Sequence, residues 1–79
     1  MPRSISNWTF KDVQKNLLKN GFVLHHVRGS HHYFKKYTNK IVYMTHVQHH
    51  GKKSIPRGTL MAIIRQSGLS VDEFVKTLK

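Results

Sequence analysis

The sequence predicts an α+β domain in which helices flank a three-stranded antiparallel sheet, in the order α-β-β-β-α-α. Two observations predict this class. Apolar residues recur at helical spacing before residue 21 and again after residue 57, whereas residues 22–46 are rich in β-branched and aromatic residues with short turns between them. The length of 79 residues supports one small core, so we expect residues 1–79 to form a single domain with a surface site.

The first helix is expected within "TFKDVQKNLLKNG", residues 9–21. Thr9 can cap this helix together with Asp12, three residues later, and Gly21 is a suitable C-terminal stop. The apolar residues at helical spacing are Phe10, Val13 and Leu17. Trp8 lies directly before the helix, and we expect it to anchor the core.

Three strands are expected in "FVLHHVR", "HHYFKKY" and "KIVYMTH". The turns Gly29-Ser30 and Thr38-Asn39 separate them, and such short connections favour a meander. An antiparallel sheet of this kind buries one face under the helices and leaves the other face open.

The period of two along a strand predicts which side chains face the helices. In the second strand Phe34 is the natural core residue and His32 shares its side. The open face then carries His31, Tyr33 and Lys35. In the third strand we expect Val42 and Met44 in the core, with Tyr43 projecting outward.

A polar, basic loop is expected over residues 47–56, followed by a helix in "RGTLMAIIRQSG". Leu60, Ile63 and Ile64 form its apolar stripe. Ser70 and Glu73 then form a capping box for a short last helix. Its apolar residues are Val71, Phe74, Val75 and Leu78.

Charge is the strongest global signal. The chain has 14 Lys and Arg against three Asp and Glu, a formal net charge of +11. This excess favours a polyanionic partner, because cations that neutralise phosphates release condensed counterions. The basic segment Lys52, Lys53 and Arg57, with Arg65 on the following helix, is a candidate for phosphate contacts near a helix N-terminus.

Residue types that are scarce exclude several kinds of chemistry. Cysteine is absent, which excludes disulfides and thiolate zinc sites. With three acidic residues, paired-carboxylate catalysis and carboxylate-bound magnesium are poorly supported. The sequence has neither a secretory signal pattern nor an apolar stretch long enough to span a membrane, so we expect a cytoplasmic protein with no membrane contact.

The seven histidines allow three interpretations. They could bind a metal, although adjacent strand residues such as His31 and His32 point to opposite faces and converge poorly on one ion. One of them could be a general base that removes the proton of an RNA 2′-hydroxyl, which requires no metal. They could also be solvated strand residues.

Three motifs in order carry a resemblance. "LLKNGFVLHHVRGSHHYF" and then "RGTLMAIIRQSGLSVDEF" resemble the HicA toxins of HicA-HicB toxin-antitoxin pairs, over roughly residues 9–75. The resemblance implies a fold like the double-stranded RNA-binding domain and an mRNA interferase. Because RNA supplies its own 2′-hydroxyl nucleophile, we expect this enzyme to be metal-independent and to need no cofactor or small-molecule ligand. The resemblance also implies two partners, mRNA and a HicB-type antitoxin.

The family's essential histidine lies in the glycine-containing segment that opens the second strand. Carried onto this sequence, that position falls on His31, with His32 as the second candidate. The chain departs from the family pattern at Thr45, where relatives often have proline, and in the longer loop before Pro56. The expected RNA-binding residues are Arg28, Ser30, Tyr33, Lys35, Lys52, Lys53 and Arg57. The alternative function is a noncatalytic RNA-binding module with the same fold, and a metal-dependent nuclease is a further rival.

Overall fold

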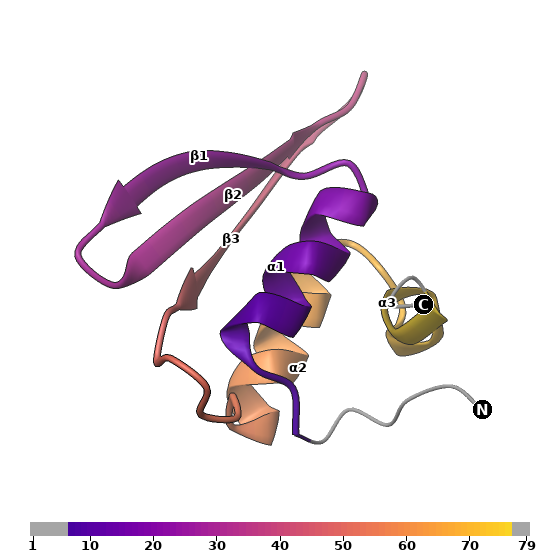
Figure 1. Cartoon of the computed structure of the whole chain (residues 1–79). Coiled ribbons are helices and arrows are strands. Elements are labelled where there is room, and N and C mark those ends of the chain that lie inside the picture. Colours follow the sequence, from indigo (N-terminus) through magenta and orange to yellow (C-terminus); the bar gives the residue numbers. More distant parts are fainter. Residues whose placement is uncertain (1–6, 77–79) are drawn as a thin grey trace.

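The computed structural model of the chain describes residues 7–76 and has the predicted element order (Figure 1). The elements are α1 (Phe10–Lys19), β1 (Val23–Arg28), β2 (His31–Tyr37), β3 (Val42–Gln48), α2 (Arg57–Gln66) and α3 (Val71–Lys76). β2 lies between β1 and β3 and pairs antiparallel with both, and the helices lie on one side of the sheet. The α+β class is therefore confirmed, and the arrangement is consistent with a fold like the double-stranded RNA-binding domain.

The signals at the two ends of α1 are confirmed. The backbone N–H of Thr9 donates to the Asp12 carboxylate at 3.0 Å, and the backbone N–H of Asp12 donates to the Thr9 hydroxyl at 3.4 Å. At the other end Asn20 is the C-cap, and Gly21 follows with φ of +91°. Glycine adopts this left-handed conformation at little cost. None of the helices within residues 7–76 is long and apolar enough to cross a membrane.

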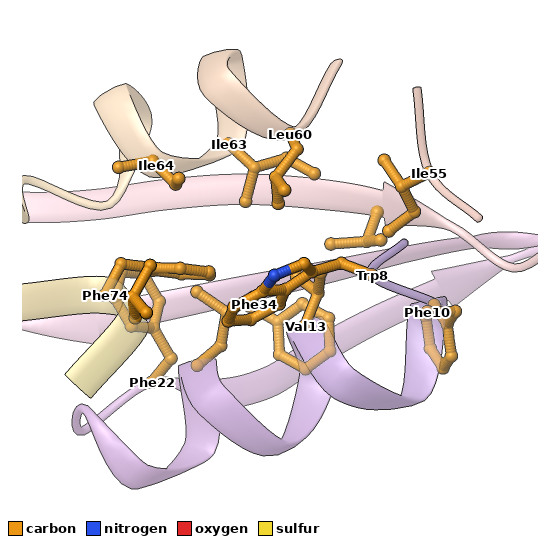
Figure 2. Close-up of a cluster of buried hydrophobic side chains, with 13 residues drawn as sticks. Trp8, Phe10, Val13, Phe22, Phe34, Ile55, Leu60, Ile63, Ile64 and Phe74 are labelled. Atoms are coloured by element: carbon orange, nitrogen blue, oxygen red, sulfur yellow. The ribbon is translucent and has the colours of Figure 1, made fainter. Parts of the chain in front are cut away.

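The core lies between the sheet and the helices (Figure 2). Trp8 is fully buried, as expected for an anchor, and its ring centroid lies 5.3 Å from that of Phe74 in α3. Phe34 of β2 is also fully buried, which confirms the predicted sides of that strand. The helices contribute Val13 and Leu17 from α1 and Leu60, Ile63 and Ile64 from α2.

β1 contains an irregularity at His25. Leu24 pairs with Phe34 and His26 pairs with Tyr33, so two steps along β1 oppose one step along β2. This is a β-bulge, in which one extra residue is left unpaired. Because of the bulge, His26 shares the open face with Tyr33.

The predicted sides of β3 are wrong. Val42 and Met44 are 49% and 52% exposed, whereas Thr45 and Val47 are buried and Tyr43 packs against the core. The strand runs to Gln48, so Val47, which the sequence places in the loop, is one of its core residues. Thr45 is tolerated inside because its hydroxyl is 2.7 Å from the side-chain oxygen of Gln66 in α2 and donates to it.

The capping box of α3 is confirmed. The backbone N–H of Ser70 donates to Glu73 at 2.9 Å, and the backbone N–H of Glu73 donates to the Ser70 hydroxyl at 3.1 Å. Phe74 and Val75 are buried as predicted. Leu78, the last predicted apolar residue, lies outside the described residues.

Candidate functional site

The open face of the sheet, on the side away from the helices, is organised in cross-strand rows. His31 of β2 lies between Arg28 and Gln48, and Tyr33 lies between His26 and His46. The next row places Lys35 between Val23 and Met44. Cross-strand partners share a face of the sheet, so this surface combines imidazoles, an aromatic ring and cations from all three strands.

Four rings on this face form a continuous series. The centroid of His31 lies 5.4 Å from that of His46, and His46 stacks on Tyr33 at 5.2 Å with 23° between the ring planes. Tyr33 in turn lies 5.7 Å from His26. We call this series the ring row. The series runs from His31 in β2 to His46 in β3, back to Tyr33 in β2 and on to His26 in β1. Each ring limits the movement of its neighbour.

His31 is half-buried at one end of the ring row. Its Nδ1 atom is buried and has no hydrogen-bond partner among the described residues. Any proton transfer by His31 therefore falls to Nε2, the other ring nitrogen. Beside the ring row, at the β3 edge, a shallow pocket of about 190 Å³ is lined by Tyr33, Met44, Thr45, His46 and Gln66.

His32 lies on the opposite side of the sheet, as its position in the strand predicted. Its ring centroid is 4.7 Å from that of Phe10 in α1 and 5.9 Å from that of His49. Its Nδ1 atom is 3.3 Å from the carbonyl oxygen of Ser30. The two adjacent histidines are therefore divided: His32 packs against the first helix, and His31 is turned to the open face.

A metal ion shared by adjacent histidines does not fit this arrangement, because His31 and His32 diverge across the sheet. Across residues 7–76, no three histidine or acidic side chains are grouped closely enough to hold an ion.

The predicted RNA-binding residues fall into two groups. Arg28, Tyr33 and Lys35 lie on the open face, and Ser30 lies in the turn beside His31, where its hydroxyl accepts a hydrogen bond from the Gln48 amide at 3.3 Å. The remaining three, which the structure does not bring to the open face, lie in the loop after β3 and at the start of α2, and all are exposed. They are Lys52, Lys53 and Arg57.

The second group lies near another pocket. Lys52 and His49 line a hollow of about 370 Å³ together with Phe10 and Lys11 of α1. The backbone N–H of His49 donates to the carbonyl of Ser30 at 2.7 Å. The loop therefore starts next to the turn that precedes His31, and its Lys52 lies beside α1, on the helix side of the sheet.

No acidic side chain of the chain belongs to the sheet. Asp12 caps α1, and Asp72 and Glu73 lie in the first turn of α3. Hydrogen bonds from Ser70 lower the pKa of Glu73, which holds it in the anionic form that caps the helix. The open face is consequently cationic or neutral throughout.

Sequence reasoning missed His46 as a site residue. His46 shares the side of Val42 and Met44. The predicted sides of β3, which are wrong, would therefore place His46 toward the core. The signal was present in the alternation of Tyr43, Thr45 and Val47, which becomes visible once β3 is extended to Gln48.

A comparison with protein families adds a further observation. A family model described as "HicA toxin of bacterial toxin-antitoxin" matches residues 10–69, from the start of α1 to beyond the end of α2. The chain belongs to the HicA toxin family. HicA toxins are known as mRNA interferases, and the family implies an antitoxin partner. The match includes the whole sheet of this HicA chain and both candidate histidines. No curated protein matches the chain.

Proposed function

We propose that this HicA toxin is a metal-independent mRNA interferase that acts in the cytoplasm, with His31 as the general base, and that a HicB-type antitoxin neutralises it. The observation that carries the proposal is the placement of His31 on an open face, beside Arg28 in its own row and with Tyr33 and Lys35 in the next two rows. His32, the second candidate, faces Phe10 instead and is suited to packing.

The reaction uses a nucleophile that RNA itself provides. His31 removes the proton of a 2′-hydroxyl through Nε2, and the oxygen attacks the adjacent phosphorus. The product is a cyclic phosphate on the upstream fragment. Arg28, the cross-strand partner of His31, is suited to stabilise the negative charge that develops on the phosphate oxygens.

RNA binding would use the same face. A base that packs on an outer ring of the ring row, which Tyr33 holds in place, would contribute about 1–3 kcal/mol, as aromatic platforms do for single strands. Arg28 and the Ser30 hydroxyl would contact the backbone near the scissile phosphate, and Lys35, two rows from His31, would contact it further along the same face. The loop group of Lys52, Lys53 and Arg57 would hold the strand further along, where it leaves the sheet.

The antitoxin would cover the same open face. The chain carries a formal net charge of +11, and no carboxylate lies on the sheet. An acidic antitoxin surface would therefore associate quickly with this face and exclude RNA from it.

The test uses purified protein and a defined RNA in excess EDTA. We expect wild-type protein to cut the RNA and His31→Ala to lose about 10²–10⁴-fold in cleavage rate, the usual contribution of a general base, while it still binds. The matched control is His25→Ala, which removes an exposed imidazole at the bulge of β1, outside the ring row. That variant is expected to cut normally.

Three outcomes would contradict the proposal. Wild-type protein that shifts the RNA in a gel and never cuts it would indicate the noncatalytic binding module. Cleavage that stops in EDTA would indicate a metal-dependent nuclease. Loss of cleavage in His32→Ala with normal cleavage by His31→Ala would identify His32, on the helix side of the sheet, as the general base.

A further inference from the structure

We infer that His46 is the general acid of this reaction, the group that protonates the departing 5′-oxygen. The inference rests on the proposed function and adds a second catalytic residue to it. It follows from the β3 register, which turns His46 onto the open face beside His31.

Cleavage of RNA by its own 2′-hydroxyl requires two proton transfers. One proton leaves the attacking oxygen and another must reach the leaving oxygen, because an alkoxide is a poor leaving group. The carboxylates of Asp12 and Glu73 are engaged in helix capping boxes, and Asp72 lies beside Glu73 in α3. The acid is therefore expected among the imidazole, amino and phenol groups near His31, and the open face is where such groups lie beside its ring.

His46 has the required placement. Its ring centroid lies 5.4 Å from that of His31, and its cross-strand partner is Tyr33, one row away from His31. Two imidazoles this close can each come within hydrogen-bond reach, about 2.6–3.2 Å, of opposite sides of one phosphodiester. His46 is also exposed, so substrate can approach it.

Tyr33 is the positioning residue. Its ring stacks on His46 at 5.2 Å and contacts His26 on the other side. This contact fixes His46 relative to His31 before substrate binds, which is the preorganisation that proton transfer requires.

The other polar groups around His46 are less suited to the role. From β1 the face presents His26 and Arg28. The ring of His26 contacts Tyr33, whereas the ring of His46 contacts His31 itself, and a guanidinium does not release its proton. From β2 it presents Lys35, which lies one row beyond Tyr33 and opposite Met44. Gln66 of α2, across the pocket, does not ionise.

The two transfers balance as one step. The 2′-oxygen forms a bond to phosphorus as its proton passes to Nε2 of His31. The bond between phosphorus and the 5′-oxygen breaks, and that oxygen takes a proton from the imidazolium of His46. The products are a 2′,3′-cyclic phosphate and a 5′-hydroxyl, with His31 protonated and His46 neutral. Exchange with water then restores both rings.

The test compares two RNAs that differ in the leaving atom. At the linkage that wild-type protein cuts, one substrate has the ordinary 5′-oxygen and the other has sulfur in its place. A thiolate leaves without protonation, so the second substrate does not need the acid. We expect His46→Ala to cut the oxygen substrate about 10²–10⁴-fold more slowly than wild type and the sulfur substrate within about threefold of it. His31→Ala is expected to be slow on both, and the control His25→Ala normal on both.

The controls separate the possible failures. Equal slowing of both substrates by His46→Ala, repeated with His46→Gln, would show a structural role and overturn the inference. Normal cleavage of the oxygen substrate by both variants would overturn it as well. Wild-type protein that cuts neither substrate would refute the proposed function, and the assignment of His46 with it. Thermal denaturation of each variant would confirm that this exposed position leaves folding intact.

Discussion

Two valines of β3 provide a direct test of the register that places His46 on the open face. Val47 is 1% exposed and Val42 is 49% exposed. Replacing Val47 by alanine removes two buried carbon atoms, about 1.6 kcal/mol at roughly 0.8 kcal/mol each. A residual cavity of about 40 Å³ would add about 1 kcal/mol. We therefore expect Val47→Ala to lower the free energy of unfolding by about 2–3 kcal/mol.

Val42→Ala is the matched control, because it makes the same chemical change on the same strand. Its side chain is half-exposed, so about half of the transfer free energy is lost, and solvent fills the space. We expect a loss of about 0.8 kcal/mol or less. The difference between the variants, about 1.5 kcal/mol or more, corresponds to roughly 6–12 °C in Tm for a domain of this size.

Urea denaturation followed by circular dichroism would measure both variants. The midpoints should differ while the slope of the free energy against urea stays the same, which shows that stability alone has changed. A larger loss in Val42→Ala than in Val47→Ala would refute the register. Such a result would also imply that the His46 side chain faces the helices and does not lie beside His31.

Two further predictions concern the stability of the fold: the contact between Gly68 and Tyr43, and the charge of Glu73. Gly68 has φ of +76°, and a Cβ there would overlap the Tyr43 ring, whereas Gly51 has φ of +63° with open space around it. Gly68→Ala should therefore lose about 2–4 kcal/mol of stability and Gly51→Ala about 1 kcal/mol, and equal losses in urea denaturation would contradict the ring contact. Because the Ser70 hydrogen bonds lower the pKa of Glu73, its charge contributes stability above about pH 4.5, which is lost as the pH falls through the folded-state pKa. Wild-type protein should thus be more stable than Glu73→Gln at pH 7, with a difference that closes on acidification, and a constant difference would argue against the charge.

The sequence predicted the elements whose ends carry strong local signals. α1 was placed correctly because Thr9, Asp12 and Gly21 mark its boundaries, and the sides of β2 followed from Phe34. These signals act within a few residues of one another, so they can be read without the fold.

β3 could not be placed in the same way. Both of its faces carry apolar residues, and the buried position at its centre is Thr45. The group that satisfies this hydroxyl is Gln66, which lies 21 residues away in α2. No local sequence pattern identifies such a partner. The side of β3 that carries Val42 and Met44 therefore appeared to be the more hydrophobic one.

The same limit applied to the candidate site. The orientation of His31 could be predicted, because it depends on β2 alone. The ring row could not be predicted, because it depends on the register of β3 and on the bulge of β1. A site built from three strands is predictable only when all three registers are known.

The bulge at His25 also bears on how related chains are to be aligned. On either side of it Leu24 and His26 keep their own faces, so deletion of His25 would join two stretches that already alternate correctly. Relatives that lack this one residue can therefore retain the same sheet and the same open face. An alignment that runs through β1 without a gap would exchange inward and outward positions in half of the strand, and would compare His26 with a residue that its relatives point at the helices.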